Sequence, residues 1–144
     1  MKVFLVAHAP TSVQRLEDLA KLAFGFGELV KGLIVTKPSG AAAQIAVPEV
    51  SKNAYKLNKV FLVLPDLDDA LELFKPDKVY TVSRDFGKRV NSLERGELVF
   101  LVVGASEPGL SKLEASKGEA VYPEGVEGEI GPIGAAALLL AGLK

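Results

Sequence analysis

Cysteine and tryptophan are absent from this chain of 144 residues, and histidine occurs once, at His8. The absence of cysteine excludes disulfides, thiolate nucleophiles and every cysteine-containing zinc site. A single histidine cannot build a His-rich metal cage either, so a metal centre would depend on carboxylates alone. We therefore predict no metal site.

A large charge of either sign is also absent. Seventeen Lys and Arg residues nearly balance eighteen Asp and Glu residues, which leaves a net charge of -1. The chain thus lacks the overall basicity that gives non-specific nucleic-acid affinity, and any RNA contact must be local. Basic residues are enriched between Lys75 and Arg95, where six of them face three acidic residues. We predict that RNA contacts this segment and the first helix.

Long hydrophobic runs are missing as well. The longest weakly polar stretch is Ile130–Leu143, which has 14 residues and includes Pro132 and three glycines. A membrane-spanning helix needs about 20 apolar residues, so this stretch is too short. The N-terminal segment Met1–Ala7 lacks the apolar length and the cleavage site of a signal peptide and is typical of a buried strand. We expect a soluble, cytoplasmic protein that does not contact a membrane.

What the chain does contain is a regular alternation of short apolar runs and segments with helical spacing. The runs are mostly continuous, which is typical of parallel strands buried on both faces. The pattern predicts one α/β domain over residues 1–144, with a mostly parallel sheet of about six strands and helices on both faces. Thr11 and Gln14 have the spacing of a capping box at the start of the first helix. The predicted strands are Lys2–Ala7, Gly32–Thr36, Lys59–Leu64, Lys78–Ser83, Leu98–Gly104 and Glu119–Pro123, and the predicted helices are Thr11–Phe24, Pro48–Leu57, Asp66–Phe74, Phe86–Leu93 and Ile133–Leu143.

Two candidate sites have ordinary structural explanations. Asp66, Asp68 and Asp69 have the spacing of a magnesium site in a metal-dependent nuclease. All three fall in the first turn of a predicted helix, however, where capping and the helix dipole account for carboxylates. His8 follows the first predicted strand, at the edge where open α/β sheets bind ligands. Because the sequence identifies no carboxylate partner for it, we interpret His8 as an ordinary loop residue.

Two glycine-rich loops in the C-terminal half are more distinctive. The first, Gly104–Ser111, follows the most apolar strand, and its glycines allow backbone amides to approach a ligand closely. The second, Tyr122–Gly134, has four glycines and two prolines and leads into an alanine-rich helix. Together they resemble motifs two and three of the SPOUT superfamily of RNA methyltransferases, particularly its SpoU-like branch. The resemblance is strongest over Leu98–Leu143, and Lys21–Gly27 stands in the place of motif one.

That resemblance implies a C-terminal trefoil knot that binds S-adenosylmethionine, and a homodimer. It also implies a function, the S-adenosylmethionine-dependent methylation of RNA, either tRNA or rRNA and not DNA. The implied catalytic residues are Arg15 and Lys21, which would hold phosphate or ribose, and Glu107, which would orient the acceptor or act as a base. The implied cofactor-binding residues are Val82, Ser83, Gly104, Ala105, Tyr122, Pro123, Ile130, Gly131 and Ile133.

The two loops also depart from the family pattern. Ser106 stands where motif two usually has glutamate, and Glu129, Ile130 and Gly131 replace the usual Ser-Leu-Asn of motif three. Two alternatives therefore stay open. One is a catalytically impaired homologue that binds the cofactor or RNA, and the other is an unknotted, flavodoxin-like nucleotide binder.

Overall fold

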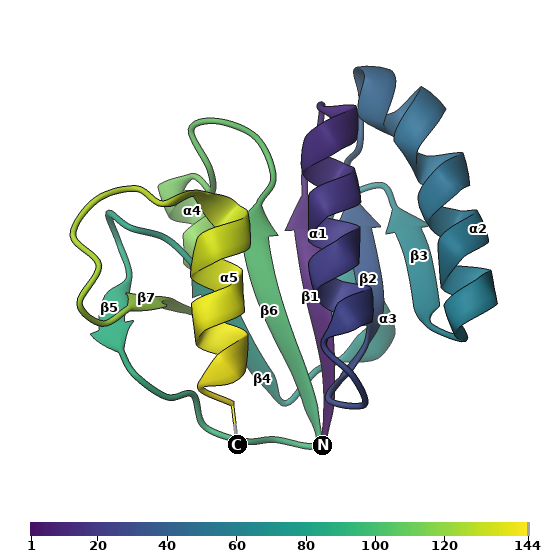
Figure 1. The fold of residues 1–144 in the computed structure, drawn as a ribbon. Helices are drawn as coiled ribbons and strands as arrows, with labels where there is room; N and C mark the ends of the chain where they lie inside the picture. The colour runs from purple at the N-terminus through teal and green to yellow at the C-terminus, as the bar shows by residue number, and fades with distance from the viewer. Residues whose placement is uncertain (144) are drawn as a thin grey trace.

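The protein is built on a sheet of seven parallel strands, as a computed structural model that describes residues 1–143 shows (Figure 1). The strand order is β3-β2-β1-β6-β4-β7-β5, and parallel neighbours require crossover connections. The predicted α/β class with a mostly parallel sheet is confirmed. The strands are β1 (Lys2–His8), β2 (Val30–Thr36), β3 (Val60–Leu64), β4 (Lys78–Val82), β5 (Lys88–Val90), β6 (Leu98–Gly104) and β7 (Glu119–Pro123).

Helices cover both faces of the sheet. In Figure 1, α1, α2 and α5 lie in front of the strands, and α3 and α4 lie behind them. Within residues 1–143, no helix is long and apolar enough to cross a membrane. The helices are α1 (Val13–Gly25), α2 (Val47–Leu57), which continues a π-helical turn (Ala42–Ala46), α3 (Leu67–Phe74), α4 (Lys112–Ala115) and α5 (Gly131–Ala141).

Both faces of the central strands are buried. In β1, Leu5 lies in the core under α1 and α5, whereas Phe4 and Val6 lie in the core under α3. On the α3 side the rings of Phe4, Phe74 and Phe100 pack against one another, with centroids 5.4 to 6.2 Å apart. This two-sided burial explains why the central strands have continuous apolar sequences and no alternation.

The cap of α1 differs from the predicted one. Ser12 is the N-cap, and its Oγ accepts a hydrogen bond from the backbone N–H of Arg15 at 3.2 Å. The Gln14 side chain forms its hydrogen bond with a side chain one turn further along the helix and not with the N-cap backbone, so the predicted capping box is not formed. Thr11 instead places its Oγ1 3.2 Å from Ser106 Oγ, in the loop after β6. Both Thr11 and Ser12 are good capping residues, and only this tertiary contact distinguishes them.

The helix predicted over Phe86–Leu93 is wrong. The chain instead makes a turn and then forms the short strand β5, which pairs with β7 at one edge of the sheet. A Cβ added to Gly87 would lie 2.3 Å from the carbonyl oxygen of Ser83, so the turn requires glycine. Three strand residues are too few for a periodic pattern to be recognised in the sequence.

The carboxyl ends of the parallel strands meet at one edge of the sheet, which lies at the top of Figure 1 and is called the carboxyl edge below. His8, Thr36 and Gly104 end β1, β2 and β6 and are neighbours in the strand register here. Ligands of open α/β sheets bind at this edge. The trefoil knot stays a prediction, and Lys144, which the predicted domain includes, lies outside the described residues.

Candidate functional site

A polar pocket opens at the carboxyl edge, between the ends of β4, β6 and β7, the start of α5 and one side chain of α1. Its cavity of about 50 Å³ has room for a few water molecules, because each requires roughly 10–15 Å³. The fold brings to this pocket residues that are far apart in the sequence. Among the site residues named from the sequence, its lining includes Arg15, Val82, Ser83, Gly104, Glu107, Tyr122 and Gly131.

The remaining residues named from the sequence do not line this pocket. Lys21 lies in a separate groove between α1 and α2, so the fold does not bring it to Arg15 and Glu107. Ala105 and Pro123 are buried, and Ile133 packs against the core under α1 and α5. The side chain of Ile130 is exposed.

Gly104 shapes the pocket through the protein's own backbone. A Cβ at this position would lie 2.5 Å from the carbonyl carbon of Gly109 and 2.5 Å from the nitrogen of Leu110. Since real Cβ atoms do not approach backbone so closely, glycine allows the 105–110 loop to fold back against the end of β6. A larger residue at Gly104 would therefore displace the loop first.

Hydrogen bonds hold this loop against the segment that follows β1. Ser106 donates its hydroxyl to the carbonyl oxygen of Ala9 at 2.7 Å, and the N–H of Ala105 donates to the carbonyl oxygen of His8 at 2.9 Å. The N–H of Gly109 donates to the carbonyl oxygen of Ser106 at 2.7 Å and closes the turn. Ser106, which stands where a glutamate was expected, thus fixes the shape of the pocket wall.

Tyr122 holds the opposite wall. Its hydroxyl oxygen accepts a hydrogen bond from the N–H of Ile130 and lies near two acceptors, Gly128 O and Glu129 Oε2, each contact measuring 3.2 Å. The guanidinium of Arg89 lies 4.9 Å from the centre of the Tyr122 ring. Burial is the main factor that raises the pKa of Tyr122, so the hydroxyl remains protonated and available as a donor. These contacts order the loop that leads into α5.

His8 has the carboxylate partner that the sequence did not identify. Its Nε2 lies 2.8 Å from Glu114 Oε2, and its Nδ1 lies 2.8 Å from Thr36 Oγ1. The histidine is 3% exposed, so both ring nitrogens are used inside the protein. Glu114 also accepts from the N–H of Ser111, in a capping box at the start of α4. The interpretation of His8 as an ordinary loop residue is therefore wrong, because it ties β1 and β2 to α4.

Two of the three acidic residues of the candidate magnesium site bind groups of the protein itself. Asp66 caps α3 by accepting from the N–H of Leu67 at 2.8 Å. Asp68 forms an ion pair with Lys117, with 2.6 Å between Oδ1 and Nζ. Nowhere in residues 1–143 are three or more His, Asp or Glu side chains arranged to hold a metal ion. The residues present thus do not fit a divalent metal site.

Charged side chains of both signs line the pocket. Arg15 reaches it from α1 and Arg84 from the turn after β4, where Arg84 Nη2 lies 3.0 Å from Asp85 Oδ1. Glu107 and Glu129 come from the loops after β6 and β7. Arginine binds phosphate through paired N–H donors, and a carboxylate can accept a proton from water. The pocket therefore carries groups that suit a phosphodiester.

Comparison with known protein sequences identifies a family and relatives that are similar to this chain. A family model described as RecB-family nuclease (DUF2122) matches residues 40–142. Proteins of Aeropyrum pernix and Methanocaldococcus jannaschii, each named "Putative type II restriction enzyme", are also similar over almost the whole chain. The first is 42% identical over 144 residues, covering 97% of this chain and 91% of the relative. The second is 36% identical over 141 residues, covering 96% of this chain and 94% of the relative.

Comparison with solved structures gives the fold a different set of neighbours. The SpoU methyltransferase AviRb from Streptomyces viridochromogenes, solved in complex with AdoMet, has a TM-score of 0.71 to this chain at 16% identity. The likeness covers 96% of this chain and 55% of that one. At this level of identity it shows a shared fold alone. The SPOUT resemblance is therefore confirmed for the fold.

The predicted function, S-adenosylmethionine-dependent RNA methylation, is wrong. It depended on loop motifs that belong to the fold, and one fold serves many unrelated activities. The sequence relatives carry restriction-enzyme names, and the family model describes a nuclease. By its sequence, this chain belongs to the RecB-family nuclease (DUF2122) family.

Proposed function

We propose that this protein binds nucleic acid at the carboxyl edge of its sheet, that the groups lining its pocket contact one phosphodiester of the bound strand, and that the strand is cleaved there. The observation that carries the proposal is the convergence of Arg15, Arg84 and Glu107 in one pocket of a nuclease-family chain. The two arginines come from separate elements, so a bound phosphate can be held from two sides.

Each of these three side chains has a role in phosphodiester hydrolysis. Glu107 accepts the proton of an attacking water molecule as the new bond from oxygen to phosphorus forms. The bond from phosphorus to the leaving oxygen breaks, and that oxygen takes a proton from solvent. Arg15 and Arg84 stabilise the negative charge that develops on the phosphate oxygens.

The names of the relatives favour DNA as the polymer. The relatives carry the name of type II restriction enzymes, a class that cleaves DNA, whereas the loop motifs led us to expect RNA and to exclude DNA. The phosphate-binding chemistry of the pocket suits either polymer. A direct comparison of a DNA duplex with an RNA of the same sequence therefore belongs in the first experiment.

Binding tests the first part of the proposal. Fluorescence anisotropy with labelled DNA and RNA should show that the Arg15→Gln, Arg84→Gln double variant binds about tenfold or more weakly. Charge-assisted hydrogen bonds each contribute roughly 1.5–3 kcal/mol, enough for such a change. Arg95→Gln is the control, because Arg95 is exposed and precedes β6 at the opposite edge of the sheet. Equal losses in both variants would contradict binding at the pocket.

Cleavage tests the second part. Labelled DNA duplex is incubated with the protein, with and without Mg²⁺, and the products are separated on a denaturing gel. Glu107→Gln should abolish cleavage and leave binding intact. Glu127→Gln, which is exposed and outside the pocket, should leave both cleavage and binding intact. Intact DNA under every condition would reject the catalytic part, and anisotropy judges the binding part separately.

S-adenosylmethionine binding is a second candidate function, favoured by a specific observation. The pocket lies at the ends of β4, β6 and β7 in a fold that AviRb shares, and AviRb is named as a complex with AdoMet. The present cavity of about 50 Å³ is too small for the whole cofactor, so its lining would have to open. Calorimetric titration with S-adenosylmethionine tests this, and the absence of heat at high protein concentration would reject it.

We also propose that the working unit is a homodimer that forms through α5. Leu138 on this helix is 53% exposed, beside hollows lined by Asn91, Ser92 and other residues. A large exposed leucine next to such hollows suits a second copy of the same surface. Leu139 is 3% exposed and belongs to the protein's own core, so it is not available to a partner.

A further inference from the structure

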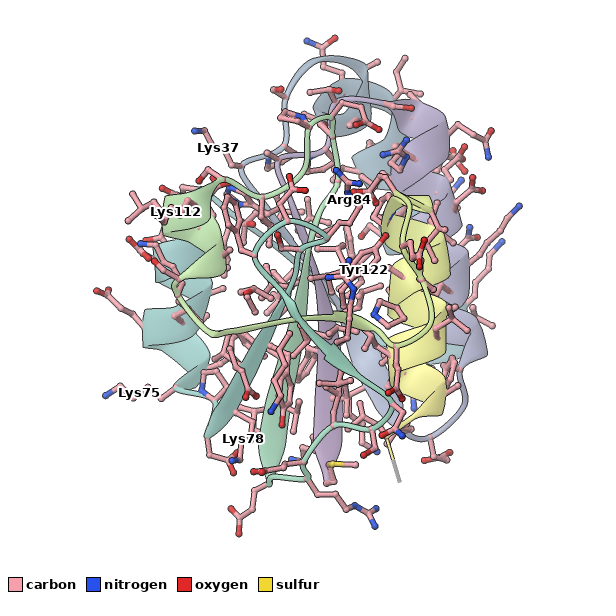
Figure 2. The ribbon with its side chains drawn as sticks, turned by 90° about the vertical axis from the view of Figure 1, so that its left-hand side faces the viewer. Lys37, Lys75, Lys78, Arg84, Lys112 and Tyr122 are labelled. Atoms are coloured by element: carbon pink, nitrogen blue, oxygen red, sulfur yellow. The ribbon has the colours of Figure 1, made fainter. Side chains whose placement is uncertain are left out.

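Two lysines lie at the carboxyl edge outside the pocket. Lys37 directly follows β2 and Lys112 begins α4, and both side chains are exposed. Figure 2 shows their side chains in the same upper part of the molecule as Arg84. The buried His8 explains this proximity, because it bonds Thr36, one residue before Lys37, and Glu114, two residues after Lys112.

The positive charge of these lysines is not neutralised inside the protein. Within residues 1–143, neither Lys37 nor Lys112 forms an ion pair. Two nearby acidic groups are already engaged, since Glu114 bonds His8 and Asp68 pairs with Lys117. The acids that line the pocket, Asp85, Glu107 and Glu129, come from the turn after β4 and the loops after β6 and β7, whereas the two lysines follow β2 and begin α4.

The backbone at Lys37 adds an independent observation. Its φ is 51°, in the left-handed region that side-chain-bearing residues avoid at a cost of roughly 1–2 kcal/mol. Glycine would remove that cost, yet this position has a long basic side chain, which is exposed. The N–H of Lys37 donates to the carbonyl oxygen of Leu64 at 3.0 Å, which fixes the strained conformation.

We propose that Lys37 and Lys112 are phosphate-binding residues that hold the backbone of a DNA duplex along the carboxyl edge and guide it into the pocket. This inference rests on the proposed nucleic-acid binding and adds the path of the strand. Arg84 continues the path at the pocket itself. The net charge of -1 is compatible with this arrangement, because a local row of basic groups needs no overall basicity.

The chain offers a matched control for Lys37. Lys75 is also exposed and also has a left-handed backbone, with φ 47°, but it ends α3 at the opposite edge of the sheet (Figure 2). Asparagine tolerates this backbone region, so Lys37→Asn and Lys75→Asn remove the same charge with the same local consequences. Lys112→Gln removes the second proposed contact on a helical residue.

Binding of a short DNA duplex is measured by anisotropy over a series of salt concentrations. Each phosphate contact contributes about 0.9 to the slope of log affinity against log salt, so the Lys37→Asn, Lys112→Gln variant should lose about 1.8 from that slope. Lys75→Asn should keep the wild-type slope. Thermal melting of all variants confirms that each is folded.

The outcomes separate the path from the proposed function. Equal slopes of log affinity against log salt for the wild type and the Lys37→Asn, Lys112→Gln variant would overturn the proposed path of the DNA backbone along the carboxyl edge. If the pocket variant Arg15→Gln, Arg84→Gln still loses affinity in that case, nucleic-acid binding at the pocket stands. A wild-type protein that does not bind the duplex at all would overturn both.

Discussion

At the scale of single residues, Glu114 makes the stability of the folded protein depend on pH. Its partial burial raises its pKa, but the hydrogen bonds from the Ser111 N–H and from His8 together outweigh burial, so the pKa lies below its ordinary value of 4.5. A depressed carboxyl pKa stabilises the fold at pH values above 4.5, and this contribution is lost as the pH falls through the folded-state pKa.

We therefore expect thermal stability to fall as the pH decreases below about 4.5. Glu114→Gln should reduce the wild-type melting temperature at neutral pH and flatten its decline in acid. Melting temperatures measured by circular dichroism from pH 3 to 7 check this. Glu119→Gln, an exposed carboxyl, is the control, and parallel curves for wild type and Glu114→Gln would contradict the role of Glu114.

Gly104 gives a second prediction at this scale. Gly104→Ala should destabilise the protein by about 1–3 kcal/mol, because its methyl group would overlap the backbone of Gly109 and Leu110. It should also weaken binding at the pocket, whose wall is that same loop. Gly128→Ala is the control, because a Cβ there meets nothing within 4 Å. Chemical denaturation measures both variants, and equal stability would show that the loop adapts without cost.

At the scale of elements, the start of α1 can be tested by its two candidate caps. Ser12→Ala should cost about 1 kcal/mol, because it removes the side-chain acceptor of the Arg15 N–H. Thr11→Ala should cost less, because its contact with Ser106 is exposed. Free energies of unfolding from urea titration compare the two, and a larger loss for Thr11→Ala would restore the cap predicted from the sequence.

At the scale of the whole molecule, the prediction concerns the proposed dimer. Leu138→Arg should leave the fold intact and dissociate the dimer, since an exposed leucine would become a charge inside the interface. Leu139→Arg should unfold the protein instead, because that side chain is buried in its own core. Sedimentation velocity combined with circular dichroism distinguishes these results. A wild-type monomer at tens of micromolar would reject the dimer.

The sequence alone determined the layers of the fold. Continuous apolar runs such as Leu98–Gly104 depend on burial of both faces of a strand, which is a local pattern that can be read directly. Short elements were not predicted correctly, because their sequence patterns are too brief to recognise. The strand β5 (Lys88–Val90) was interpreted as part of a helix, and the helix α4 (Lys112–Ala115) was not predicted. Its capping residues, Ser111 and Glu114, were a readable signal for α4.

Only the tertiary structure decided which residues form the site. The sequence named Arg15, Lys21 and Glu107 together, but the crossovers of a parallel sheet bring Arg15 to Glu107 and leave Lys21 in another groove. Arg84 and Glu129 also line the pocket, although neither was among the catalytic or cofactor-binding residues named from the sequence. The His8 and Glu114 pair, 106 residues apart, has no local pattern at all. Such contacts depend on how distant strand ends align, and no short segment of sequence encodes that alignment.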